Sequence, residues 1–149
     1  MARFIFALQN VLNMKEKVEA QAKQEFATAT GLLEEQKQIL DGLYQRKEEI
    51  FEEGRQLING KLDFHDIENN RLAQEYVERK IEEQKVNVNK AEANVERARR
   101  KMTDAVADKK TYDRLREKAF DEFMLEENRA ESKVVDELTS YTYGQRVKV

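Results

Sequence analysis

The sequence contains no cysteine, no proline and no tryptophan, and only five of its 149 residues are glycine. The absence of cysteine excludes disulfides, thiolate nucleophiles and cysteine-ligated zinc. The absence of proline leaves long helices uninterrupted. A disordered chain of similar charge would be rich in proline, serine and glycine, which this chain is not. The composition therefore favours long helices exposed to water.

Long hydrophobic runs are missing as well. No uncharged stretch approaches the ~20 residues that a transmembrane helix needs. The first residues also lack the apolar core of a secretory signal peptide. We therefore expect a soluble, cytoplasmic protein. The formal net charge of −3 provides no global basic field for nucleic acid, and we expect no nucleic-acid partner.

Side chains that do chemistry are scarce. His65 is the one histidine, and no glycine-rich phosphate loop or zinc-protease motif is present. A metal site needs several ligands, so a lone histidine is more often a solvated residue. Acidic pairs such as Glu34-Glu35 are expected to point into water, without a pocket that would shift their pKa values. We expect no enzyme activity, no catalytic residue, no cofactor, no metal and no small-molecule substrate.

Charged residues make up 38% of the chain, against roughly a quarter in ordinary domains. Between them, apolar residues recur every three or four positions, which predicts a first helix from about residue 4 to 58. The apolar members of the predicted contact row are Phe4, Leu8, Val11, Val18, Ala22, Ala29, Leu32, Ile39, Leu43, Ile50 and Leu57. A neighbouring row widens this stripe with Ile5, Leu12, Phe26, Leu33 and Leu40.

Residues 59–63 are the predicted turn. Asn59 and Gly60 tolerate positive φ and are expected to end the first helix. Asp63 is expected to cap a second helix, from about residue 64 to 143, by accepting its free amides. The contact row of this helix is predicted to include Val77, Ile81, Gln84, Val88, Ala91, Val95, Ala98, Met102 and Ala105. A short turn between long helices implies antiparallel packing, so residues 1–149 are predicted to form one all-α domain, a long antiparallel two-helix coiled-coil hairpin.

The two predicted helices differ in length. Folding the hairpin at its turn places Phe4 opposite about residue 118, which leaves about 25 residues at the C-terminal end without an intramolecular partner. Apolar side chains continue through this segment, including Phe123, Val134, Val135 and Leu138. An uncovered apolar stripe of this size is typical of a binding surface.

Charge is unevenly distributed along the second helix. Basic residues gather at 97–101 and 109–118, and acidic residues follow from Asp121 to Glu137. One interpretation is a mixed helix surface with ion pairs within the helix. The other is a charge-polarised docking surface for a protein partner. The sequence leaves both open.

Two segments carry a family resemblance. The string Phe4-x-Phe6-x-Leu8-Gln9-x-Val11-Leu12 resembles the opening of the flagellar export protein FliJ family. The segment from Glu127 to Leu138, with Asp136-Glu137, resembles the end of that family's members. The length, the lack of cysteine and the two-helix pattern agree, although Ala7 stands where a basic residue is common in the family.

The resemblance implies a stalk and adaptor of the flagellar type III export apparatus, held at the inner face of the membrane at the flagellar base. Such proteins resemble the central stalk of rotary ATPases, insert in the hexameric flagellar export ATPase, contact the membrane protein of the export gate and escort substrate chaperones. The residues expected to dock on the ATPase are Phe4, Phe6, Leu8, Phe123, Val134, Val135 and Leu138. Leu72 and Tyr76 are expected to meet the gate. A generic coiled-coil scaffold, or a rotary-ATPase stalk of another complex, is the alternative.

Overall fold

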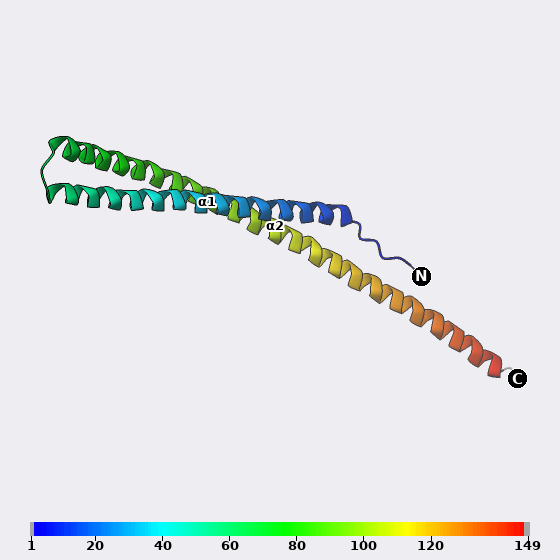
Figure 1. Ribbon diagram of the computed structural model, residues 1–149. Helices are drawn as coiled ribbons and strands as arrows, with labels where there is room; N and C mark the ends of the chain where they lie inside the picture. The colour runs from blue at the N-terminus through cyan, green and yellow to red at the C-terminus, as the bar shows by residue number, and fades with distance from the viewer. Residues whose placement is uncertain (1, 148–149) are drawn as a thin grey trace. The chain divides into compact units, whose positions relative to one another are not determined.

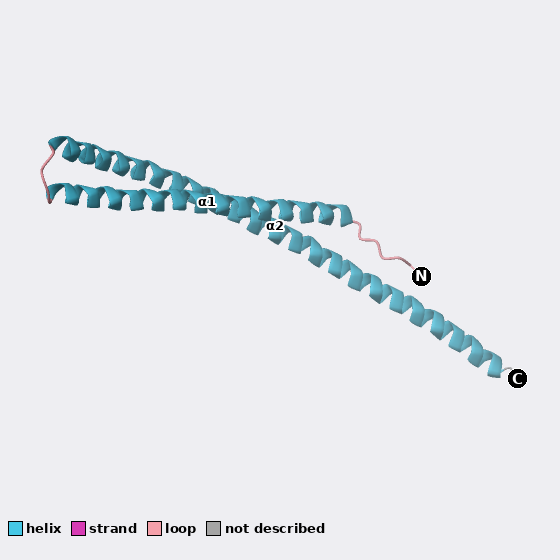
Figure 2. Cartoon of the chain, viewed as in Figure 1, coloured by secondary structure: helices cyan, strands magenta, loops and turns pink. Residues whose placement is uncertain are grey.

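The fold is an antiparallel pair of helices. The computed structural model describes residues 2–147, and helices are the only regular secondary structure within that range. Helix α1 spans Gln9–Ile58 and helix α2 spans Phe64–Val147. The two run in opposite directions from a single turn (Figure 1), and the remaining described segments are loops (Figure 2). The predicted all-α, two-helix hairpin is confirmed.

The helix ends differ from those expected. Helix α1 begins at Gln9, later than the expected start near residue 4, and α2 continues to Val147. Leu8, just before α1, has no side-chain oxygen to accept the free amides of the first turn. That turn also contains no acidic residue. Because the local sequence does not mark this start, the reason must lie in packing of the N-terminal segment.

The turn is formed by residues 59–63. Asp63 caps α2 as predicted, because its Oδ1 accepts a hydrogen bond of 2.9 Å from the backbone N–H of His65. Helix α1 ends at Ile58, directly before Asn59 and Gly60, and neither of these residues has a positive φ. Helix α1 ends instead with a hydrogen bond of 3.2 Å from the N–H of Asn59 to the carbonyl oxygen of Gln56.

Contacts divide the chain into two compact units. The hairpin unit is Gln21–Thr103, and the terminal unit combines Met1–Ala20 with Asp104–Val149. Each unit contains one stretch of α1 and one of α2, so each holds a pair of antiparallel helical segments. That residues 1–149 form one domain stays a prediction.

The hairpin unit has a small apolar core near the turn. Ile50, Val77 and Ile81 are each buried to 4% exposure or less, and Leu40, Leu43 and Ala73 pack against them. Helix α2 presents the predicted row, with Val77, Ile81, Val88, Ala91 and Ala105 buried.

On α1 the predicted row is correct only in part, since four of its eleven apolar residues are exposed. Leu43, Ile50 and Ala22 face the partner helix as expected, but Val18, Leu32 and Ile39 do not. These three side chains are exposed, and the residue after each one is half-buried instead. The half-buried residues are Glu19, Leu33 and Leu40. The two rows are one residue apart, so the sequence pattern alone did not distinguish them.

A polar layer interrupts the apolar contacts. Gln84 is 7% exposed, and its Nε2 donates to the backbone oxygen of Gln36 at 2.9 Å and to Gln36 Oε1 at 2.8 Å. Asn87 Nδ2 donates to Gln84 Oε1 at 3.1 Å. Because a buried amide is costly unless it is hydrogen-bonded, this layer favours one alignment of the two helices over its neighbours.

Candidate partner-binding surfaces

The N-terminal segment is attached to α2 by an aromatic cluster. The ring of Phe4 meets that of Phe120 edge-on, with centroids 5.2 Å apart, and lies 5.5 Å from that of Phe123. The guanidinium of Arg116 lies 5.5 Å from the centroid of the Phe4 ring. Arg116 Nε also donates to Gln9 Oε1 at 3.0 Å, which ties the start of α1 to the same cluster. These contacts explain why the segment leaves the helix before Gln9.

This cluster changes the interpretation of several predicted docking residues. Phe4 and Phe123 are half-buried against each other, so they are already covered within the chain. Phe6 is half-buried too, whereas Leu8 is exposed. Phe120, which the sequence placed in the uncovered segment, is the closest ring to Phe4. Its aromatic character, three residues before Phe123, was the signal for an aromatic cluster here.

Helix α2 continues past this cluster with apolar side chains exposed. Val134, Val135 and Leu138 are 54%, 58% and 61% exposed. Beyond them Tyr141 and Tyr143 are exposed as well, and a shallow hollow is lined by Val135, Leu138, Thr139, Thr142 and Tyr143. In the terminal unit α2 runs on beyond the N-terminal segment (Figure 1). Nothing from α1 therefore covers these side chains.

Leu72 and Tyr76 form a second exposed apolar site, on the outer side of α2 in the hairpin unit. They are 49% and 56% exposed, in contrast to Val77, which is 3% exposed and packs in the core. The cationic groups of Arg79 and Lys80 lie 5.9 Å and 5.5 Å from the Tyr76 ring. The site therefore presents an apolar side chain and a tyrosine with basic neighbours.

Three of the four basic residues at 97–101 form ion pairs. Arg99 and Arg100 bind Glu96, at 2.6 Å and 3.3 Å, and Lys101 reaches across to Glu25 on α1 at 2.9 Å. The hydrogen bond from Lys101 lowers the pKa of Glu25 below its usual range, opposed by its burial. Arg99 lowers the pKa of Glu96 in the same way. The interpretation as a surface with ion pairs therefore fits residues 97–101. In the second basic cluster Lys109 pairs with Asp113 at 3.5 Å, whereas Lys110, Arg114 and Lys118 form no ion pair with the described residues.

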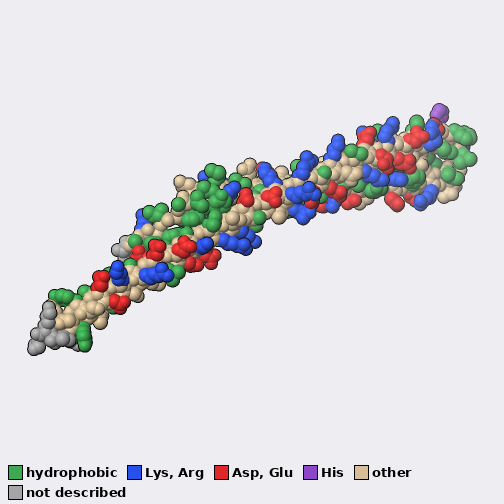
Figure 3. Space-filling model, turned by 180° about the vertical axis from the view of Figure 1, so that it is seen from behind, with side chains coloured by type: hydrophobic (Ala, Val, Ile, Leu, Met, Phe, Trp, Pro, Cys, Tyr) green, Lys and Arg blue, Asp and Glu red, His purple; other side chains and the backbone are tan. Residues whose placement is uncertain are grey.

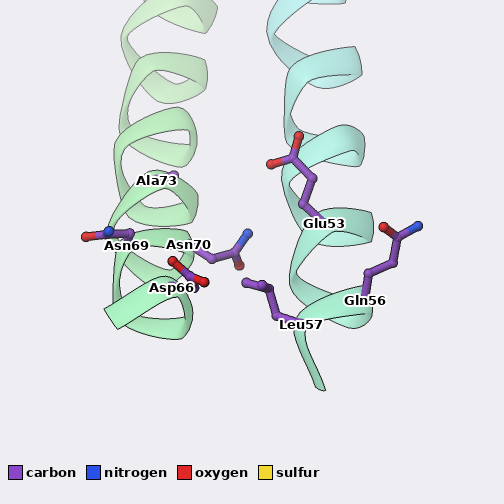
Figure 4. Close-up of a pocket in the computed structure, with 7 residues that line it drawn as sticks. All are labelled: Glu53, Gln56, Leu57, Asp66, Asn69, Asn70 and Ala73. Carbon is purple, nitrogen blue, oxygen red and sulfur yellow. The ribbon is translucent and has the colours of Figure 1, made fainter. Parts of the chain in front are cut away.

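No catalytic or metal-binding site is evident among the described residues. No group of three or more His, Asp or Glu side chains there could hold a metal ion. His65 is exposed (Figure 3). An open hollow of about 520 Å³ lies beside the turn, between Glu53, Gln56 and Leu57 of α1 and four residues of α2 (Figure 4). In it Asp66, Asn70 and Leu57 point into the gap and Glu53 is directed towards it, while Asn69 and Gln56 point away.

The described residues form an all-α coiled-coil hairpin. No described helix combines the length and apolarity needed to cross a bilayer. Comparison with known families matches residues 4–148 to the family described as Flagellar FliJ protein, so the chain belongs to the FliJ family. This confirms the resemblance of the sequence and makes the chain a protein related to flagellar export. Searches of curated proteins and of solved structures each give no match.

Proposed function

We propose that this chain is the stalk and adaptor of the flagellar type III export apparatus, working in the cytoplasm at the inner face of the membrane. Its C-terminal part of α2 inserts in the ring of the export ATPase. Leu72 and Tyr76 meet the membrane protein of the export gate, and the chain escorts the chaperones of export substrates. Membership of the FliJ family supports this proposal, as does the non-catalytic, structural character of that family.

The observation that carries the ATPase contact is the uncovered end of α2. Val134, Val135 and Leu138 stay more than half exposed, although full burial of such side chains stabilises a complex by about 1.5–3 kcal/mol each. A helical segment without a packed partner is also only marginally stable in water. A partner that encloses this end relieves both deficits. A ring-shaped ATPase with an axial opening is such a partner.

The experiment is a truncation that ends the chain at Asn128. This variant keeps Phe120 and Phe123, and therefore the cluster around Phe4, but removes Val134, Val135 and Leu138. We expect an unchanged melting temperature and loss of binding to the purified export ATPase, together with loss of any stimulation of ATP hydrolysis. Full-strength binding by the truncated chain would show that another surface meets the ATPase.

A further inference from the structure

We infer that the ATPase surface receiving the end of α2 is an apolar groove that also carries lysine and arginine side chains, placed opposite Glu127 and Glu131. This inference rests on the proposed function and specifies the chemistry of the partner. We call the relevant side of α2 the C-terminal face. It consists of Glu127, Glu131, Val134, Leu138 and Tyr141.

The helical repeat places these five residues together. Glu127 and Glu131 are four residues apart, Val134 follows three residues later, and Leu138 and Tyr141 continue with steps of four and three. Residues spaced by three or four along a helix lie on one side of it. The two carboxylates are therefore on the same side as the apolar side chains, and a partner that covers one group also covers the other.

The carboxylates from Asp121 to Glu137 form no ion pair with the described residues, and Glu127 is half-buried whereas Glu131 is exposed. From Asp121 to Glu137 there are seven carboxylates and two basic side chains, a net charge of −5, whereas the whole chain carries −3. Ion pairs across the helices do occur elsewhere, as in Lys15 with Asp108 and Lys101 with Glu25. Carboxylates without an ion pair to a described residue are also found where the helices lie side by side, for example Glu34, Glu35 and Glu92, so the distinguishing feature of this segment is its net charge of −5. Figure 3 shows acidic side chains beside hydrophobic ones towards this end.

Burial of the C-terminal face requires opposite charge in the partner. A carboxylate that enters an apolar groove without a cation or a hydrogen-bond donor loses its hydration with no compensation. A purely apolar groove would therefore reject Glu127 and Glu131 while accepting Leu138. A second copy of this chain is a poor occupant, because the two acidic segments would repel each other. A groove with both basic and apolar side chains would pair with the two carboxylates and bury Val134, Leu138 and Tyr141.

The test measures binding of the full-length chain to the purified export ATPase over a range of salt concentrations. For the native chain we expect the affinity to fall steeply as salt rises, because charge pairs at an interface are screened. The double variant Glu127→Gln/Glu131→Gln keeps the shape of both side chains. We expect it to raise the Kd about tenfold or more at low salt and to flatten the salt dependence. The matched control Glu34→Gln/Glu35→Gln changes the net charge equally on exposed, distant residues and should leave the Kd within about twofold.

The outcomes separate this inference from the proposed function. Native binding that is insensitive to salt and unchanged in the Glu127→Gln/Glu131→Gln variant overturns the basic groove but leaves ATPase docking intact. An equal effect of both double variants also overturns it, because net charge alone would then explain the result. Absence of native binding at any salt concentration overturns the proposed function as well. Sedimentation tests the remaining occupant: a dimer that Leu138→Ser abolishes would assign the C-terminal face to a second copy.

Discussion

Small residues decide how closely the two helices approach at single positions. Gly54 on α1 faces Asn70 on α2, and a Cβ atom added there would lie 2.5 Å from Asn70 Oδ1. Asn70 is not free to move away, because its Nδ2 donates to the carbonyl oxygen of Ile50 at 2.8 Å and its Oδ1 accepts from Gln74 at 2.8 Å. Gly31, in the same helix, has open space around its Cα. A methyl group would therefore clash with Asn70 at position 54 but meet no other atom at position 31.

Alanine is predicted to stabilise the protein at position 31 but not at position 54. Gly31→Ala should raise the free energy of unfolding by about 0.5–1 kcal/mol, because glycine is a poor helix former and nothing obstructs a methyl group. In Gly54→Ala the same gain is offset by loss of the Asn70 hydrogen bonds, worth about 0.5–1.5 kcal/mol each, so we expect no gain or a net loss. Urea unfolding followed by circular dichroism measures both. Equal stabilisation by the two variants would contradict the role assigned to Asn70.

A charge in the contact row tests its placement. Ala98 is half-buried against α1, whereas Ala93 on the same helix is exposed. Ala98→Glu should lower the free energy of unfolding by about 1–3 kcal/mol, because the carboxylate would be partly buried without a partner. Ala93→Glu should change it by less than about 0.5 kcal/mol. Thermal melts of both variants decide the matter, and an unchanged melt of the Ala98 variant would mean that the row is misplaced.

At the scale of elements, the N-terminal segment and α2 stabilise each other without a helical pairing. Residues 2–8 are not helical, although Phe4, Leu8 and Leu12 continue a helical spacing with no glycine or proline between them. The aromatic contacts of Phe4 with Phe120 and Phe123 stabilise the non-helical path. Phe4 thus makes both ring contacts that join the N-terminal segment to α2.

Phe4→Ala should therefore loosen the terminal unit and leave the hairpin unit intact. Aromatic pairs contribute about 0.5–1.5 kcal/mol beyond their buried area, and the variant loses two of them. We expect faster amide hydrogen exchange in residues 9–20 and 116–127 but unchanged exchange around Ile50. Ile5→Ala is the matched control, since Ile5 is 79% exposed. The same increase in both variants would mean that the rings do not hold the segment.

At the scale of the whole molecule, the two proposed docking sites belong to different compact units. Leu72 and Tyr76 are in the hairpin unit, and the C-terminal face is in the terminal unit. Neither site shares a contact residue with the other. Substitutions at sites that share no contacts act independently in general, so a substitution at one site should abolish binding of one partner and leave binding of the other unchanged.

The double variant Leu72→Ala/Tyr76→Ala is predicted to abolish swimming without changing helix content or affinity for the ATPase. Both side chains are about half exposed, so their loss removes little packing within the chain. Val86→Ala, an exposed apolar position on the same helix, is the control and should swim normally. Soft-agar motility, circular dichroism and ATPase binding provide the three measurements. Normal swimming of the double variant would remove Leu72 and Tyr76 from the gate contact.

The sequence by itself determined the fold class, the turn and the contact row of α2. One mostly apolar row runs from Val77 to Ala105, so the side of α2 that faces the other helix could be predicted from its spacing. Asp63 follows a glycine-containing break, so the start of α2 could be predicted from its capping residue. The family signature at the two ends was readable in the same way, and it led to the class of function. Leu72, Tyr76, Val134 and Leu138 were predicted as surface residues, and they are exposed.

Only the tertiary structure decided which side of α1 faces its partner and where its N-terminal segment lies. Leu32 and Leu33, like Ile39 and Leu40, are equally apolar neighbours, and the surface of α2 selects the second of each pair. Phe4 lies outside α1 because its ring packs against the rings of Phe120 and Phe123 on α2. Both outcomes depend on side chains far away in sequence. Local patterns weigh each residue against its neighbours, so they cannot encode a choice made by contacts across the hairpin.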